Sequence, residues 1–193
     1  MRDRVNGQCR QVDAKMNAMK PMETTAMAAS VCVVGVGMTA FAKPGAHAPY
    51  PDMAAQAVND ALADAGLVYA DMQQAYAGYV YGDSTAGQRA LYGVGMSGVP
   101  IFNVNNNCAT GSTALYLARQ AVASGAADCV LALGFEHMNP GALGTVFKDR
   151  PSPFDPFDQA TAELVGRDDI ALALRYFGGA GLAHMQQYGT RLE

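Results

Sequence analysis

The chain has 193 residues, of which half are hydrophobic and 16% are charged, a composition typical of a globular protein with one apolar core. The formal net charge is −4 and basic residues are scattered, so the sequence gives no electrostatic footprint for nucleic acid or an anionic membrane. No apolar stretch approaches the roughly 20 residues that a membrane-spanning helix needs. We therefore expect no nucleic-acid partner and no membrane span.

The first thirty residues mix basic and acidic side chains and contain no apolar segment of the kind that a secretory signal requires. Residues 1–30 are therefore predicted to be a disordered extension. Four cysteines lie far apart, without metal-ligand spacing, and they suggest neither a zinc site nor a disulfide framework. Reduced thiols indicate a cytoplasmic location. The cysteines are Cys9, Cys32, Cys108 and Cys129.

Strands and helices alternate in the first part of the chain. Residues 31–36 are a β-branched run closed by glycines, which predicts a buried strand. Small apolar residues at helical spacing predict a helix over residues 52–65. A strand at residues 75–81 and a short helix at residues 88–96 follow.

The alternation continues with a strand at residues 99–104, a helix at residues 109–124 and a strand at residues 128–135. Such an order is typical of a mainly parallel sheet covered by helices on both faces. The predicted fold is therefore a three-layer α/β unit. Residues 139–169 are rich in Pro, Gly, Asp and Phe without regular periodicity, and we interpret them as a functional loop region. Two helical patterns close the chain, at residues 171–177 and 182–188.

Cys108 lies at the junction between the strand at 99–104 and the helix at 109–124. Free backbone N–H groups and the positive end of a helix dipole stabilise a thiolate there, and the thiolate is the nucleophilic form. The same amides could hold an oxyanion that develops on an attacked carbonyl, and Gly111 with Ser112 allows another backbone to approach. The alternative is a buried structural cysteine, because free cysteines are often buried. Spacing alone does not separate the two.

Four strings occur in order along the chain: VVGVGMTAF, YVYGDSTAGQRALY, NVNNNCATGSTAL and DCVLALGFEHM. Together they resemble the N-terminal half of sterol-carrier-protein-type thiolases, over roughly residues 31–193. The resemblance implies a core domain over residues 31–138 and the start of a loop domain over residues 139–193, truncated relative to the family. It also implies the lipid metabolism of fatty acid β-oxidation, and a peroxisomal location if the source is eukaryotic.

The resemblance implies that Cys108 is the catalytic nucleophile, which accepts the acyl group of a 3-oxoacyl-CoA, possible substrates being branched-chain or steroid side-chain acyl-CoAs. Coenzyme A, a substrate rather than a permanently bound cofactor, then releases the acyl group from the enzyme. In the family a histidine and a second cysteine of the C-terminal half act as base and acid. This sequence contains neither partner, so we expect the chain to be inactive alone.

Other polar residues are weaker candidates. We interpret His47, His137 and His184 as surface or packing residues, and Cys129 as a buried structural residue, like Cys9 and Cys32. Glu136 follows the last strand, where it is expected to bond nearby backbone or to lie at a subunit interface.

The resemblance also assigns residues to contacts outside the core. Gln88 and Arg89 lie in the segment that packs across the family's dimer interface, so they are interface candidates. Lys148 and Arg150 lie in the region that borders the CoA site, so they are substrate-binding candidates for the acyl-CoA phosphates. Partners are then acyl-CoA and a second copy or a chain that supplies the missing half. No metal site is predicted.

Two alternatives stay open. The chain could be a non-catalytic acyl-CoA-binding partner subunit that assembles with another chain. It could also be a retro-aldolase-like relative, since the thiolase fold hosts carbon–carbon cleavage that relies on other residues. Sterol carriage itself is not implied, because the small lipid-carrier domain has no room in this sequence.

Overall fold

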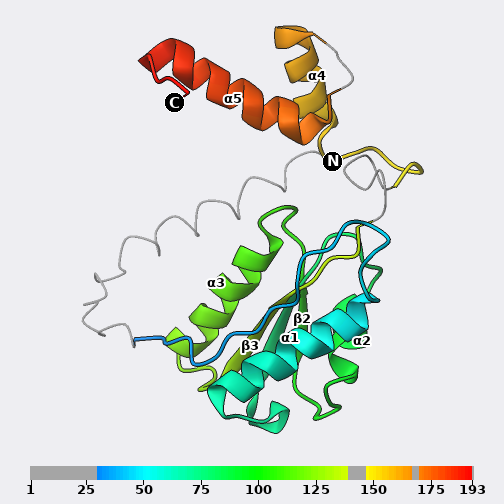
Figure 1. Ribbon diagram of the computed structural model, residues 1–193, viewed down its shortest axis with the longest axis vertical. Helices are drawn as coiled ribbons and strands as arrows, with labels where there is room; N and C mark the ends of the chain where they lie inside the picture. The colour runs from blue at the N-terminus through cyan, green and yellow to red at the C-terminus, as the bar shows by residue number, and fades with distance from the viewer. Residues whose placement is uncertain (1–29, 139–146, 167–169, 193) are drawn as a thin grey trace, which may run out of the picture. The chain divides into compact units, whose positions relative to one another are not determined.

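The structure is a computed structural model that describes residues 30–138, 147–166 and 170–192. The expected extension over residues 1–30 lies, apart from Ser30, outside the described residues. The strands are β1 (Gln74–Gly78), β2 (Ile101–Val104) and β3 (Val130–Gly134). The helices are α1 (Tyr50–Ala65), the 3-10 turn η2 (Tyr69–Asp71), α2 (Ala86–Tyr92), α3 (Thr110–Ala123), α4 (Asp155–Val165) and α5 (Leu172–Tyr188) (Figure 1).

The sheet holds three parallel strands in the order β2–β1–β3, so the first strand along the chain is central. Ala75 of β1 pairs with Ile101 of β2 on one side and with Leu131 of β3 on the other. Because parallel strands need a crossover helix, α2 lies between β1 and β2 in the chain and α3 between β2 and β3. The predicted parallel sheet is confirmed.

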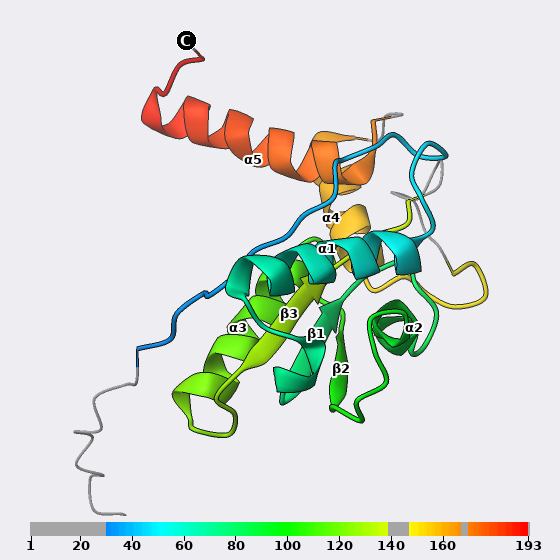
Figure 2. The same ribbon diagram turned by 60° about the horizontal axis from the view of Figure 1, so that its bottom comes forward.

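Helices cover both faces of the sheet, α1 and α2 on one side and α3 on the other (Figure 2). The alternation of side chains along each strand sorts the core into two clusters. Ala75 and Leu131 pack toward α1 and α2, where Leu91 is fully buried. Tyr76 points the other way and packs on the alanines of α3. This arrangement confirms the predicted three-layer α/β fold.

The strand predicted at residues 31–36 is wrong, because this segment runs as extended chain along α1 outside the sheet. The backbone amide of Val36 donates to Asp64 Oδ2 at 2.9 Å. A Cβ atom added to Gly35 or Gly37 would clash with the α1 backbone at the carbonyls of Ala61 and Ala57, respectively. Glycine therefore places this segment on the helix, and the clustered valines that indicated a strand point into solvent.

The C-terminal part of the chain differs from the prediction in two ways. Helix α4 lies within the stretch interpreted as loop, with Pro156 in its first turn and Asp155 and Asp158 near its N-terminus. Helix α5 is continuous across the two separate patterns that were predicted, although it contains Gly178, Gly179 and Gly181. Residues 139–146 and 167–169, also assigned to the loop region, lie outside the described residues.

Candidate active site

Cys108 is held on a tight turn between the end of β2 and the start of α3. Asn107, just before it, has the left-handed backbone conformation, with φ of 48°. Thr110 closes the turn from inside: its hydroxyl accepts a hydrogen bond from the amide of Asn106 at 2.8 Å and donates one to the carbonyl of Asn107 at 2.6 Å. Thr110 is itself buried, which fixes the turn against the sheet.

The thiol of Cys108 is exposed beside the N-terminus of α3. The backbone amides of Gly111 and Ser112 have no acceptor among the described residues, while the amide of Thr113 bonds the carbonyl of Ala109. The first turn of α3 also contains no acidic residue. Free amides and the helix dipole therefore favour negative charge close to the cysteine.

Two glycines lie where the neighbouring strands reach this turn, and the contact is tight at the first of them. A Cβ atom on Gly78, at the end of β1, would lie 2.8 Å from Thr110 Cγ2. One on Gly134, at the end of β3, would lie 3.8 Å from the α-carbon of Gly111. The carboxyl ends of β1 and β3 therefore meet at the start of α3, where an α/β sheet commonly places its site.

Glu136 lies just beyond β3 and bonds the turn that follows β1. Its carboxylate accepts hydrogen bonds from the amides of Val80 at 3.0 Å and Tyr81 at 3.1 Å. Backbone bonding is one of the two roles expected for Glu136. Burial, with the charges of Glu136 and Cys108 as further causes, raises the pKa of Tyr81. Sequence reasoning missed Tyr81, because nothing in its spacing links it to the cysteine.

The histidines are engaged in packing, as interpreted. The rings of His47 and His137 pack edge to face with centroids 4.4 Å apart. His47 also bonds the carbonyls of Ala48 at 3.1 Å and Met138 at 3.4 Å. His184 packs on Tyr188 at 4.7 Å in α5. Nothing in these contacts assigns a base to Cys108.

The other cysteines have different surroundings. Cys129 is half-buried at the start of β3 with its sulfur 4.0 Å from that of Met72, which fits a structural residue. The expectation that Cys32 is buried is wrong, because its segment lies outside the sheet and leaves it exposed. Cys9 lies outside the described residues.

Gln88 is bonded to β2 within the chain. Its Oε1 accepts a hydrogen bond from Asn103 Nδ2 at 2.8 Å, and its Nε2 donates to the carbonyl of Ile101 at 3.4 Å. Arg89 next to it is exposed. Their assignment to a subunit interface stays a prediction.

Lys148 and Arg150 are both exposed. The guanidinium of Arg150 forms an ion pair with Asp149, with Nη2 2.7 Å from Oδ2. It also lies over the ring of Phe147, with Cζ 4.7 Å from the ring centroid. The hydrogen bond from Arg150 lowers the pKa of the Asp149 carboxyl. Because Asp149 offsets the charge of Arg150, Lys148 is the stronger of the two phosphate-binding candidates.

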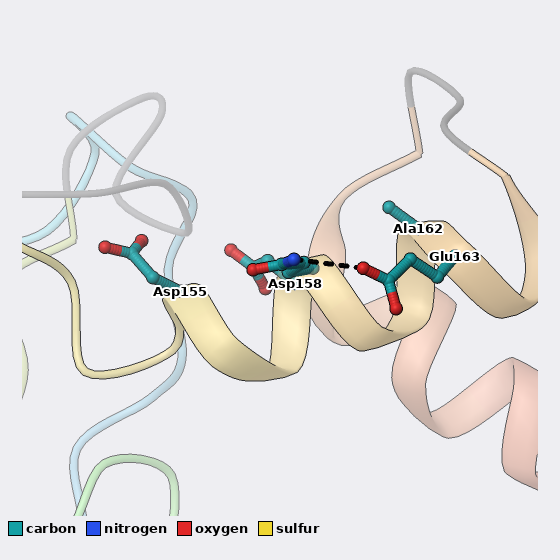
Figure 3. A pocket seen from close by; sticks show the side chains of 5 residues that line it. Asp155, Asp158, Ala162 and Glu163 are labelled. Atoms are coloured by element: carbon teal, nitrogen blue, oxygen red, sulfur yellow. Dashed lines mark hydrogen bonds between the residues drawn. The ribbon is translucent and has the colours of Figure 1, made fainter.

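A hollow on α4 is lined largely by acidic side chains (Figure 3). Gln159 Nε2 donates to Glu163 Oε1 at 3.0 Å on its rim. Among the described residues, no group of three or more His, Cys, Asp or Glu side chains could hold a metal ion.

Comparison with known proteins decides the family. The family model for the thiolase N-terminal domain matches residues 31–148. The chain belongs to the thiolase family. Cys108 and the turn that carries it lie inside the matched thiolase domain.

Curated relatives support the same assignment. The chain is 54% identical to sterol carrier protein 2 of Gallus gallus over 165 residues, which cover 84% of this chain and 30% of that protein. It is 54% identical to the Homo sapiens protein over 166 residues, with the same coverage. It is 45% identical to the non-specific lipid-transfer protein-like 2 of Caenorhabditis elegans, of which it covers 41%. This thiolase chain thus spans less than half of these relatives.

A solved structure with a similar fold is that of the Ltp2–ChsH2(DUF35) aldolase. The match covers 81% of this chain and 38% of the aldolase chain, with a TM-score of 0.57 and 20% sequence identity. At that identity the likeness concerns the thiolase-like fold alone. None of the helices in the described part of the chain is long and apolar enough to cross a membrane.

Proposed function

We propose that this chain is the nucleophile-bearing part of a thiolase-type acyltransferase that acts on 3-oxoacyl-CoA. The observation that carries the proposal is the exposed Cys108, which lies on a left-handed turn directly before α3 and beside two amides that have no acceptor among the described residues. Covalent catalysis by a thiol needs an accessible sulfur and donors aimed at the charge that develops on the attacked carbonyl. The exposed cysteine and the neighbouring amides without an acceptor among the described residues support this role for the turn.

The reaction proceeds in two half-reactions. The Cys108 thiolate attacks the 3-oxo carbonyl carbon, and the oxygen becomes an oxyanion that the amides of Gly111 and Ser112 could receive. The bond between C2 and C3 then breaks, leaving the shortened acyl group on sulfur, and the enolate that departs takes a proton to become acetyl-CoA. The thiol of a second CoA loses its proton and attacks the acyl thioester, which releases acyl-CoA and restores the Cys108 thiolate.

These steps need an acid and a base that the described residues do not place beside Cys108. His47 and His137 are engaged with each other and with backbone carbonyls. We assign the proton transfers to the part of the thiolase fold that follows the region described here, since the chain covers 30% of its vertebrate relatives. Coenzyme A is the cosubstrate, and Lys148 is the first candidate for its phosphates.

Acylation of Cys108 alone tests the proposal, because this half-reaction needs no second substrate. The 193-residue chain is incubated with acetyl-CoA, and acetylated cysteine is located by peptide mass spectrometry. We expect acetylation at Cys108, none in Cys108→Ser, and unchanged acetylation in the matched control Cys32→Ser, which removes another exposed thiol. Acetylation of Cys32 and Cys108 at equal rates in the folded chain would contradict a dedicated nucleophile.

A further inference from the structure

The segments that leave β1, β2 and β3 are tied together at one edge of the sheet. The amide of Tyr79 donates to the carbonyl of Val104 at 3.2 Å, and the amide of Phe135 donates to the carbonyl of Gly78 at 3.1 Å. These bonds continue the strand ladders past the last paired residues. The edge beside Cys108 is thus a connected backbone framework rather than three separate loops.

Glu136 adds a further link to this framework, in which the acceptor is a side-chain carboxylate and not a backbone carbonyl. Its two carboxylate oxygens bond the consecutive amides of Val80 and Tyr81, which are 56 and 55 residues away in the chain. Hydrogen bonds to a charged acceptor are about twice as strong as those between neutral groups. The turn after β1 is therefore held to β3 by the carboxylate of a single residue.

That turn carries Tyr81, whose pKa is raised by burial first and then by the charges of Glu136 and Cys108. Burial is the first cause that keeps the phenol protonated, and the two charges add to it. The start of α3 lies beside the same turn, because Gly78 at its base is packed against Thr110.

We propose that Glu136 is a positioning residue for Cys108: its carboxylate fixes the Val80–Tyr81 turn against the turn that carries the nucleophile. The hydrogen bonds of Glu136 to the turn are a property of the fold, whereas their effect on acyl transfer rests on the proposed function. Glu136 does not exchange a proton with the substrate. It acts through the backbone of the Val80–Tyr81 turn.

The test compares a reagent that needs positioning with one that does not. In Glu136→Gln, one of two paired acceptors becomes a donor, so the turn is released. We expect acetylation of Cys108 by acetyl-CoA to fall by about ten-fold or more, because small displacements of a reacting group are costly. Alkylation of Cys108 by iodoacetamide should stay within about two-fold, because Thr110 holds the cysteine turn independently.

A second measurement follows the Tyr81 phenol by NMR titration of isotope-labelled tyrosine, assigned with Tyr81→Phe. Removing the Glu136 charge removes one cause of the raised pKa, so the Tyr81 midpoint should move down in Glu136→Gln. The matched control is Asp83→Asn, in the same loop, whose carboxylate bonds only the adjacent amide of Ser84 among the described residues. It should change neither acetylation nor the Tyr81 midpoint.

The outcomes separate this proposal from the proposed function. If no form of the chain is acetylated, the proposed function fails, and the Tyr81 midpoint alone decides the positioning proposal. A folded Glu136→Gln with an unchanged midpoint and unchanged acetylation overturns it. Equal losses of acetylation and alkylation also overturn it, because the residue is then merely structural. Should Glu136→Gln not fold, Glu136→Asp, one methylene shorter, is expected to show the same selective loss of acetylation, and retained acetylation would overturn the proposal.

Discussion

Gly78 at the end of β1 lies against Thr110 at the start of α3, so closely that an added Cβ atom would be 2.8 Å from Thr110 Cγ2 and 3.0 Å from its carbonyl oxygen. The same threonine closes the turn of Cys108 through its hydroxyl. Close packing between a strand and a helix therefore determines where the nucleophile is held. Substitutions at this contact should affect both stability and reactivity.

Gly78→Ala is expected to destabilise the chain by about 1–3 kcal/mol, because backbone atoms must move to admit the methyl group. It should also slow acetylation of Cys108, since Thr110 is displaced. Chemical denaturation and peptide mass spectrometry measure the two effects. Gly93→Ala is the control, because that glycine has φ of −71° and open space at its Cβ position. Equal stability of the two variants would contradict the contact.

Asn107 should tolerate glycine but not alanine. Its φ of 48° lies in the left-handed region, which costs an alanine about 1–2 kcal/mol and costs glycine little. Asn107→Ala is therefore expected to lose about that much unfolding free energy and to slow acetylation of Cys108, while Asn107→Gly retains acetylation. If the alanine variant is as stable as the glycine variant, the turn does not require the left-handed conformation.

Asn103 joins α2 to β2 through both ends of its amide. Its Oδ1 accepts from the amide of the buried Gly87 at 2.9 Å, and its Nδ2 donates to Gln88. Asn103→Ala leaves the Gly87 amide unpaired, at a cost of about 1–3 kcal/mol in unfolding free energy. The control is Asn59→Ala, at an exposed position on α1, which should change the unfolding free energy by less than about 0.5 kcal/mol. Thermal unfolding compares the two, and similar melting temperatures would refute the role.

The cysteines should label in a pH-dependent order. Burial, followed by the charge of Asp71, raises the pKa of the Cys129 thiol, so this thiol stays protonated to higher pH. Iodoacetamide labelling of Cys129 should therefore lag behind that of Cys108 near neutral pH and accelerate only in more alkaline buffer. Asp71→Asn should shift this acceleration to lower pH. If Cys129 reacts as fast as Cys108 at neutral pH, the upward shift of the Cys129 pKa is contradicted. Cys108 should also react faster than Cys9.

Thiolytic turnover by the 193-residue chain alone is expected to be negligible even where Cys108 is acetylated. Deprotonating CoA and protonating the enolate each need a positioned group, worth about 10²–10⁴-fold. CoA-dependent cleavage of a 3-oxoacyl-CoA is the measurement, with Cys108→Ala as control. Substantial turnover that depends on Cys108 would show that this chain holds its own acid and base.

Much of the fold follows from the sequence because apolar strands alternate with helices of small apolar residues. The apolar run of residues 75–81 predicted β1 and the small-residue pattern of residues 109–124 predicted α3, each with ends displaced by a few residues. The strand prediction was wrong for residues 31–36. Their composition is typical of a strand, but glycine contacts place the segment on α1, and the periodicity of the sequence does not reveal such contacts. Helix α4 was missed because its prolines and aspartates, typical of loops, also begin helices.

The candidate site was predictable in part for the same reason. Cys108 became a candidate through its place between a strand and a helix, which is local information, and the family resemblance then favoured a nucleophile over a structural cysteine. The bond between Tyr81 and Glu136 beside it joins residues that are more than fifty positions apart in the chain. Nothing local marks that pair, and only the parallel arrangement of β1 and β3 brings them together.

The central position of β1 also has a consequence for the kinetics of folding. Both strands that pair with β1 come later in the chain, so every strand pairing in this sheet closes a long loop and folding is expected to be slow for a chain of this size. The Cys108 turn lies inside the loop that joins β1 to β3. Its distinct reactivity should therefore emerge in the same slow phase as the sheet itself, and a refolding chain should label like an unfolded one until that phase is complete.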